Sequence, residues 1–368
     1  MRVEAVELRE VRLPLRFPFE TSFGRSETKV CVLVRVWADG AEGWGEAPVD
    51  AAPLYNEETV ATAWHVLEAF IIPEVLGRPL EHPRDFPPRV ARLRRHHMAK
   101  AGLEAALWDA YGRLGGRSLR ALLGGVRQQV DVGVSLGIEP DVEVLLDRIG
   151  HFLDQGYQRI KVKIKPGWDV AVVQRIREVY GDVTLQVDAN AAYTLDDAAV
   201  FRTLDRFNLL LIEQPLEEDD LVDHAALQRE VRTPICLDES ITSPSVARKA
   251  LQIGACRIVN IKQARVGGLG AATAIHDLCR AQGVPVWCGG LLETGVGRAA
   301  NLALASLPGF TLPADLSASD RYFDEDIIDP PVRLGPGGTI AVPDGPGLGV
   351  TVRMDRVEAV TTRQAVYR

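Results

Sequence analysis

Five short stretches decide the fold of this chain, and each is an apolar run that ends in a charged residue. They read Arg159-Ile-Lys-Val-Lys163, Thr184-Leu-Gln-Val-Asp188, Leu209-Leu-Leu-Ile-Glu213, Ile235-Cys-Leu-Asp238 and Arg257-Ile-Val-Asn-Ile-Lys262. Apolar runs of this length, separated by amphipathic segments, are typical of strands that alternate with helices. The region therefore predicts a parallel sheet built from strand–helix units.

The same alternation starts at about residue 130 and continues to about residue 320. Eight strand–helix units over roughly 190 residues favour a TIM-like barrel. The units are short for a complete barrel, so we expect one helix to be missing. The predicted strands are Val132–Ser135, Arg159–Ile164, Thr184–Val187, Leu209–Ile212, Ile235–Leu237, Arg257–Ile261, Val284–Trp287 and one near Leu312. The clearest helices are Val142–Gln155, Ala171–Val179 and Pro244–Gln252.

The chain on either side of the barrel has a different pattern. Residues 1 to about 60 alternate as in antiparallel strands, with Asp39-Gly40 as a hairpin turn, and residues 57–125 show helical periodicity. Strands followed by helices predict an α+β domain. We expect an α+β capping domain at 1–125, the barrel at 126–322, and a C-terminal segment at 323–368 that returns to the capping domain.

Composition narrows the function classes. The 368 residues carry a net charge of −8 with no basic block, which argues against nucleic acid or an anionic membrane as a partner. No apolar stretch approaches the roughly 20 residues that span a bilayer. The five cysteines form no CxxC pair and are expected to be reduced, which fits a cytoplasmic protein.

The charged residues at the strand ends point to a chemistry. In a TIM barrel the active site lies at the carboxyl ends of the strands. Asp188, Glu213 and Asp238 are a ligand set for a hard divalent cation, here Mg²⁺, with Mn²⁺ or another divalent ion as a substitute. Lys163 and Lys262 flank the set and suit proton transfer to and from a carbon acid. Lys161 beside Lys163, and Arg265 beside Lys262, are expected to lower the lysine pKa values by crowding.

These residues resemble a known family. Lys161-Val-Lys163, Asp188-Ala-Asn190, Glu213-Gln-Pro215, Asp238-Glu-Ser240 and Lys262 resemble the muconate-lactonising-enzyme subgroup of the enolase superfamily. That resemblance implies a (β/α)₇β barrel with a capping domain over the whole chain. Four further segments resemble the o-succinylbenzoate synthase / N-succinylamino acid (N-acylamino acid) racemase family: residues 19–24, 161–168, 289–298 and 315–323.

The resemblance implies a role for each site residue. Lys163 and Lys262 would be opposed acid/base groups at the α-carbon of a small carboxylate substrate, acting through an enolate. The products would be a racemised N-succinylamino acid, or o-succinylbenzoate by the dehydration of menaquinone biosynthesis. The other expected site residues comprise a substrate-binding group, Lys161, Asn190, Ser135, Gly289, Gly290, Leu291, Phe19 and Phe23, and a supporting group, Glu239, Arg265 and Glu293. A homo-oligomer is also expected.

Several alternatives stay open at this point. Phe19 and Phe23 would form a lid over the site or simply pack within the capping domain. A dipeptide epimerase shares the lysines and the carboxylates, but typically has Asp-x-Asp where this chain has Asp315-Leu-Ser317. Muconate cycloisomerase is a further alternative, and a non-catalytic binder would be expected to lose a lysine or a carboxylate. Leu291 stands where many relatives have Met, which leaves the side-chain preference open.

Overall fold

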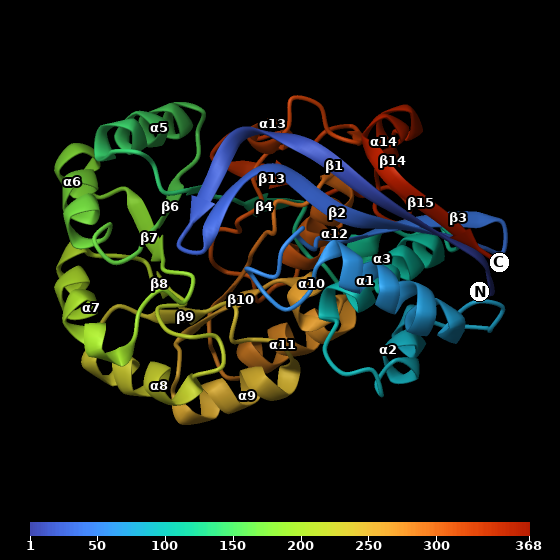
Figure 1. Cartoon of the computed structure of the whole chain (residues 1–368), viewed down its shortest axis with the longest axis horizontal. Coiled ribbons are helices and arrows are strands. Elements are labelled where there is room, and N and C mark those ends of the chain that lie inside the picture. Colours follow the sequence, from blue (N-terminus) through green and yellow to red (C-terminus); the bar gives the residue numbers. More distant parts are fainter.

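The computed structural model describes residues 1–368, and its N-terminal part is an antiparallel sheet that packs against helices (Figure 1). The strand order is β15-β1-β2-β3, so the last strand of the chain lies beside the first, and the two termini are close together. Asp39 and Gly40 both have positive φ values, 48° and 82°, and form the predicted two-residue turn between β2 and β3. The strands are β1 (Val3–Thr21), β2 (Gly24–Ala38), β3 (Ala41–Ala47) and β15 (Thr361–Tyr367).

The central helix of this part, α3 (His97–Leu114), is buried on nearly every side because it lies between the sheet and the barrel. Two glycines of β3 allow the close approach. A Cβ at Gly43 would lie 2.2 Å from the carbonyl oxygen of Ala106, and one at Gly45 would lie 2.1 Å from that of Gly102. The other helices of this part are α1 (Val60–Val66), η1 (Leu67–Ile71), η2 (Ile72–Glu74), η3 (Pro83–Asp85), α2 (Phe86–Arg89) and α4 (Leu119–Leu123).

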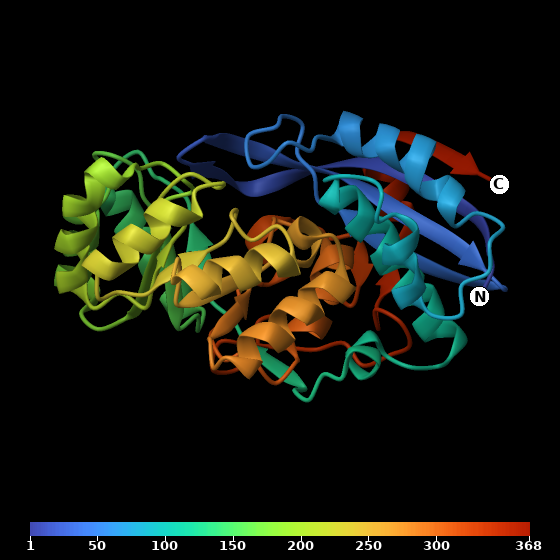
Figure 2. The same ribbon diagram turned by 90° about the horizontal axis from the view of Figure 1, so that it is seen from below.

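The second part is a curled parallel sheet of seven strands in the order β11-β10-β9-β8-β7-β6-β5, with helices on its outer side (Figure 2). The strands are β5 (Val134–Leu136), β6 (Arg159–Lys163), β7 (Thr184–Asp188), β8 (Ile212–Glu213), β9 (Ile235–Leu237), β10 (Ile258–Ile261) and β11 (Val286–Cys288). The helices are α5 (Val142–Asp154), α6 (Val170–Tyr180), η4 (Leu195–Asp197), α7 (Ala198–Leu204), η5 (Asp205–Phe207), α8 (Leu221–Glu230), α9 (Pro244–Ile253), α10 (Gln263–Val266), α11 (Leu269–Ala281) and α12 (Gly295–Ala305). The predicted fold class, a modified barrel with a capping domain, is confirmed.

The eighth strand, expected near Leu312, is not a regular strand. Instead, residues 310–315 close the barrel through single parallel bridges, Phe310 to Val286 of β11 and Ala314 to Val132. Pro313 explains the interruption, because proline has no N–H to donate to a ladder. The barrel is therefore closed on one side by isolated contacts rather than by continuous pairing.

Residues 354–360 of the C-terminal segment form a helix, α14 (Met354–Val360). The last strand then pairs with β1 of the N-terminal sheet. The division of the chain at residues 125 and 322 stays a prediction. No helix combines the length and apolarity needed to cross a membrane, and all five cysteines are free and buried. The remaining elements are β4 (Gln129–Asp131), α13 (Ser319–Tyr322), β12 (Ile328–Asp329), β13 (Thr339–Ala341) and β14 (Thr351–Val352).

The contact between β3 and α3 gives a stability prediction. Gly45→Ala adds a methyl group where a backbone oxygen already lies, so the helix or the sheet must shift, at a cost of about 1–3 kcal/mol in the free energy of unfolding. Gly115→Ala is the matched control, since its Cβ meets only an ordinary contact at 3.5 Å. Thermal unfolding of both variants tests the idea. Equal melting temperatures for Gly45→Ala and the wild type would contradict it.

Candidate active site

The strand order brings the predicted site residues together. β7, β8 and β9 carry Asp188, Glu213 and Asp238 at their carboxyl ends, and these strands lie between β6, which ends at Lys163, and β10, which is followed by Lys262. All five side chains are buried in the barrel. The curled sheet therefore places a row of carboxylates between two lysines.

Strand periodicity fills the barrel interior with charge. Side chains two residues apart on a strand point the same way, and on β6 this gives the inward series Arg159, Lys161 and Lys163, all buried. Lys161 contacts three carboxylates: Asp315 at 2.9 Å, Glu213 at 3.1 Å and Asp188 at 3.3 Å. Its Nζ also lies 5.0 Å from the ring centre of Trp287. Lys161 is thus the central cation of the interior network.

Lys163 has a separate set of partners at the top of β6. Its Nζ donates to Asp188 Oδ2 at 2.6 Å and to Asn190 Oδ1 at 2.7 Å. The Asn190 amide in turn donates to Glu239 Oε1 at 2.7 Å, which fixes which end of the amide faces the lysine. Phe19, from the N-terminal sheet, has its ring centre 5.8 Å from Nζ.

Lys262 stands opposite, above β10. Its Nζ lies 2.7 Å from Asp238 Oδ2 and donates to the hydroxyl of Tyr55 at 3.2 Å. Arg265 pairs with the other oxygen of Asp238 and donates to the carbonyl groups of Ile241 and Asn260. The guanidinium is therefore fixed by three groups. It places a permanent positive charge beside Asp238, the carboxylate that Lys262 also contacts.

The expected lowering of the lysine pKa values is wrong for this structure in two cases. Burial disfavours the Lys161 ammonium, but Asp315, Glu213 and Asp188 outweigh burial and raise the pKa of Lys161 well above its usual value. For Lys262, burial and Arg265 oppose the charge, yet Asp238 prevails and raises the pKa. Crowding by like charges is present, as expected, but each lysine lies directly on carboxylates, and the attraction is larger.

The carboxylates respond in the matching way. Burial disfavours the Asp238 anion, but Lys262 and Arg265 outweigh it and hold the pKa below the usual range. The pKa of Asp188 is also lowered, because Lys163 and Lys161 outweigh its burial. For Glu213, burial and the charge of Asp188 raise the pKa well above its usual value. The row is therefore anionic at both ends.

The three carboxylates suit a hard divalent cation by chemistry, since carboxylate oxygens are the preferred ligands of Mg²⁺. Asp238 Oδ2 also accepts no hydrogen bond of good geometry, although it is buried. As the side chains stand, however, no group of three or more acidic, His or Cys side chains is arranged to hold a metal ion. Asp188 and Asp238 are each paired with lysine or arginine, and Glu213 accepts from Lys161. The three carboxylates therefore fit a divalent cation by their chemistry. In the present arrangement they form ion pairs with lysine and arginine side chains.

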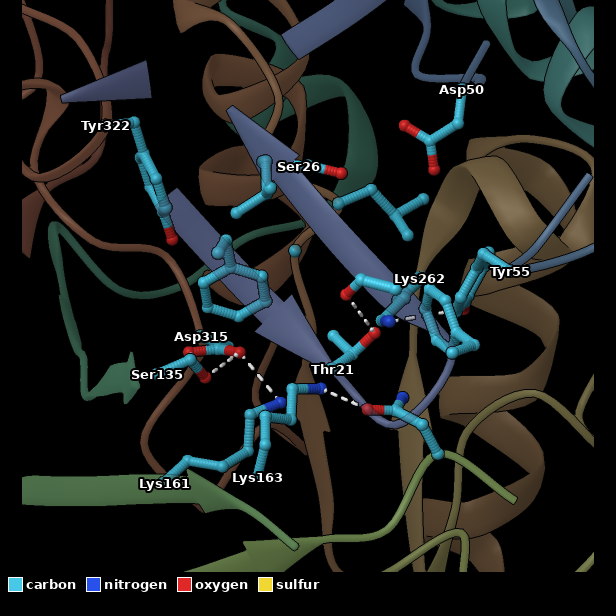
Figure 3. Close-up of a pocket in the computed structure, with 17 residues that line it drawn as sticks. Thr21, Ser26, Asp50, Tyr55, Ser135, Lys161, Lys163, Lys262, Asp315 and Tyr322 are labelled. Atoms are coloured by element: carbon cyan, nitrogen blue, oxygen red, sulfur yellow. Dashed lines mark hydrogen bonds and ion pairs between the residues drawn. The ribbon is translucent and has the colours of Figure 1, made fainter. Parts of the chain in front are cut away.

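A cavity that is partly open to solvent lies over this row (Figure 3). Lys161 and Lys163 lie together at one side of it, and Lys262 and Tyr55 lie at the other. Of the predicted residues, those that line the cavity are Phe19, Phe23, Ser135, Lys161, Lys163, Asn190, Lys262, Gly290 and Leu291. Lining residues that the sequence analysis did not assign to the site are Thr21, Gly24, Ser26, Asp50, Tyr55, Leu292, Asp315 and Tyr322.

Gly289 was expected in the pocket but does not line it. It packs on Asn260 instead, where a Cβ would lie 2.3 Å from the amide oxygen. Asn260 donates to Glu213 Oε1 at 2.7 Å, so the glycine makes room for a residue that orients a carboxylate of the row. The predicted supporting residue Glu293 accepts from the Leu291 N–H at 2.7 Å and from Asn301 at 2.9 Å, and so fixes the loop that lines the cavity.

Phe19 and Phe23 lie at the end of the β1–β2 hairpin, next to Gly24. Phe19 is within β1, paired with Ser26, and Phe23 is in the tight turn between the strands. Ser22 in the same turn donates to the Asn190 carbonyl at 3.1 Å. The hairpin tip therefore reaches the barrel and covers one side of the cavity.

Two of the residues missed by the sequence analysis have clear reasons for being missed. The Ser135 hydroxyl oxygen lies 2.8 and 2.7 Å from the two carboxylate oxygens of Asp315, which also pairs with Lys161, but the segment before Asp315 is irregular in the structure. Its place just after the eighth expected strand was a usable signal. Tyr55 comes from the segment between β3 and α1, and no periodicity or motif places that segment at the barrel mouth.

Comparison with known proteins agrees with this architecture. Residues 3–124 match the model of the mandelate racemase / muconate lactonizing enzyme N-terminal domain, and residues 145–356 match that of the enolase C-terminal domain-like family. An enolase-superfamily member from Listeria innocua has a solved structure with a TM-score of 0.95 and 38% identity, covering 100% of this chain and 99% of that one.

Two further relatives are similar over nearly the full length. An o-succinylbenzoate synthase from Geobacillus stearothermophilus is 52% identical, covering 100% of this chain and 98% of that protein. An N-succinylamino acid racemase from Thermus thermophilus is 50% identical, covering 99% of this chain and 98% of that protein. The chain therefore belongs to the mandelate racemase / muconate lactonising subgroup of the enolase superfamily and is an enzyme of the o-succinylbenzoate synthase / N-succinylamino acid racemase family.

Proposed function

We propose that this enzyme racemises N-succinylamino acids, and that the same site also dehydrates the cyclohexadiene precursor to o-succinylbenzoate. The observation that carries the proposal is the pair Lys163 and Lys262, which line one cavity from strands separated by the three carboxylate strands. Racemisation needs one group to remove the α-proton and another to return a proton on the opposite face. Two lysines on opposite sides of a substrate meet that need.

The two lysines act as acid and base, and the residues around them have supporting roles. One lysine takes the α-proton while the other, protonated, delivers a proton to the far face, and their roles exchange for the other enantiomer. In the dehydration Lys163 is the base, and Lys262 stays protonated and stabilises the enolate. Lys161 contributes a fixed positive charge near the substrate carboxylate, and Asn190 orients Lys163. Phe19 and Phe23, at the hairpin tip, exclude water from the cavity as a lid.

Members of the superfamily typically use a divalent metal ion. We assign Mg²⁺, with Mn²⁺ as a substitute, to Asp188, Glu213 and Asp238, and expect their present contacts with lysine to yield to the ion. When bound, the ion supplies positive charge that stabilises the enolate of the substrate carboxylate. The substrate is a small-molecule carboxylate, and we expect the protein to act as a homo-oligomer.

The runner-up activities are dipeptide epimerisation and muconate cycloisomerisation. Dipeptide binding would be favoured by a second carboxylate near Asp315, but residue 317 is a fully buried serine whose hydroxyl donates to the Gly133 carbonyl at 3.3 Å. Asp315 itself is already paired with Lys161 and Arg159. This part of the cavity therefore offers little negative charge to a peptide amino group.

Removal of the metal tests the carboxylate assignment. Activity is expected to disappear in excess chelator and to return with Mg²⁺ or Mn²⁺. Asp238→Asn removes one anionic ligand and should weaken Mg²⁺ binding at least ~10-fold in calorimetric titration. Asp196→Asn, the same change at an exposed position away from the site, is the control. Full activity in the presence of chelator would disprove the assignment.

A comparison of substrates tests the reaction itself. We expect turnover of an N-succinylamino acid, followed by loss of optical rotation, and measurable dehydration of the cyclohexadiene substrate, followed by absorbance. The dipeptide Ala-Glu should be a poor substrate, because Ser317 replaces the second carboxylate. The values of kcat/KM for the three substrates decide the question. Efficient dipeptide epimerisation without turnover of succinylated amino acids would overturn the proposal.

The lysines are tested one at a time. Lys163→Ala should still exchange the α-proton of one enantiomer with deuterated solvent through Lys262, and Lys262→Ala should exchange only the other. Each variant should lose racemisation by about 10²–10⁴-fold, the usual effect of a positioned acid or base. Both should also lose the dehydration. Lys249→Ala, at an exposed position on α9, is the control. Racemisation near the wild-type rate in either lysine variant would show that another group carries the proton.

A further inference from the structure

The two lysines have surroundings of the same kind. Lys163 has a carboxylate, Asp188, a neutral oxygen acceptor, Asn190, and an aromatic ring, Phe19. Lys262 has the carboxylate Asp238 at 2.7 Å, and both the neutral acceptor and the ring are supplied by Tyr55. The Nζ atom lies 3.2 Å from the Tyr55 hydroxyl and 4.7 Å from its ring centre.

The difference between the two sets is where the neutral acceptor comes from. For Lys163 it comes from the barrel, two residues after Asp188 on the same loop. For Lys262 it comes from the N-terminal part, 207 positions away in the sequence. No barrel side chain supplies a neutral acceptor to Lys262. The Tyr55 hydroxyl accepts the hydrogen bond that Lys262 Nζ donates in the structure. The environment of Lys262 is therefore complete only when the segment that carries Tyr55 lies against the barrel.

Tyr55 is itself held in position from both sides. Its hydroxyl donates to Asp238 Oδ1 at 3.2 Å, and a phenol keeps its proton near neutral pH, so it can donate there and accept from Lys262 at the same time. Its ring contacts that of Phe23 at the hairpin tip, with 6.5 Å between centres. Figure 3 shows Tyr55 and Lys262 side by side at one end of the cavity, away from Lys163.

The segment that carries Tyr55 is fixed to the rest of the N-terminal part. Glu58, three residues on, accepts from the backbone N–H groups of Met98 and Ala99 at 2.8 and 3.0 Å, at the first turn of α3. Asp50 bridges to Thr59 at the two ends of the segment. The hydroxyl of Tyr55 is thus presented to the barrel from a braced loop rather than from a free one.

We infer that Tyr55 is the positioning residue of Lys262, and that it serves one face of the substrate and not the other. The inference rests on the proposed two-lysine racemisation. By accepting a hydrogen bond and placing its ring beside Nζ, Tyr55 restricts the Lys262 side chain, which has four rotatable bonds, to the geometry that reaches the substrate. Lys163 does not need it, because Asn190 plays that part on the other side.

Exchange of the α-proton with deuterated solvent, measured separately for each enantiomer of an N-succinylamino acid by proton NMR, tests this inference. The enantiomer that depends on Lys262 is identified as the one whose exchange is lost in Lys262→Ala. In Tyr55→Phe, which keeps the ring, this enantiomer should exchange about 10-fold more slowly, because a hydrogen bond to a charged group is lost. The other enantiomer should stay within about 2-fold of the wild type. Tyr55→Leu, which also removes the ring, should widen the difference.

Two controls separate positioning from a general effect. Tyr180→Phe removes a hydroxyl that donates to the Leu146 carbonyl on the outside of the barrel and should change neither enantiomer. Calorimetric titration of Mg²⁺ into Tyr55→Phe should give an affinity within about 3-fold of the wild type, although the hydroxyl contacts Asp238. Melting temperatures of all variants establish that they are folded.

The outcomes are distinct. Slower exchange of the Lys262-dependent enantiomer alone supports the inference. The inference would be overturned if exchange of both enantiomers slowed equally, or if neither slowed. It would also be overturned if the slowing disappeared at saturating Mg²⁺, because Tyr55 would then act through the metal ligand Asp238. If the wild type exchanges neither enantiomer, the two-lysine function fails, which is a separate result from a wild type that exchanges both.

Discussion

The ion pairs of Lys161 are the interaction on which the rest of the site depends. This buried ammonium contacts Asp315, Glu213 and Asp188 at 2.9, 3.1 and 3.3 Å, and these residues follow the eighth, fourth and third strand positions of the barrel. Three carboxylates buried without cations would be very unstable, and removing one member of a buried pair typically costs about 3–5 kcal/mol. The positive charge of Lys161 therefore allows these acidic groups to lie close together in the buried interior of the barrel.

The two parts of the chain complete one another at this site. The barrel supplies the row of charges. The N-terminal part supplies mostly apolar and neutral side chains, together with Asp50, from the β1–β2 hairpin and from the segment that contains Tyr55. Their contact is close because Gly43 and Gly45 let α3 lie directly on β3, and α3 in turn packs on α10, which follows Lys262. Backbone packing in the N-terminal part thus affects the position of the helix that follows Lys262.

Most of the barrel site was predictable from sequence, because strand periodicity and the position of active sites in barrels are strong constraints. The carboxylates and both lysines lie where those rules place them, and Asn190, Glu239 and Glu293, which the family resemblance indicated, are also buried. Their chemical roles remain predictions. What was not predictable depends on contacts between distant segments: the place of Tyr55, and the closure of the barrel by an irregular segment ending at Asp315. The direction of the Lys262 pKa was predicted wrongly, since spacing reveals neighbours of like charge but not the 2.7 Å contact with Asp238.

The site is nearly symmetric about Glu213, and this symmetry bears on how one cavity would serve the two proposed reactions. Reading across β6, β7, β8, β9 and β10, the side chains are lysine, aspartate, glutamate, aspartate and lysine. Each outer aspartate also contacts a second cation, Lys161 for Asp188 and Arg265 for Asp238. The proposed racemisation asks for an acid/base group on each face of the substrate, and the two lysines occupy corresponding places in this arrangement. The proposed dehydration asks for one base and one cation, and the unequal parts of the arrangement would suit that division. Arg265 is permanently charged and Tyr55 belongs to the other part of the chain, so the Lys262 side differs from the Lys163 side in the origin of the groups that contact its aspartate, Asp238.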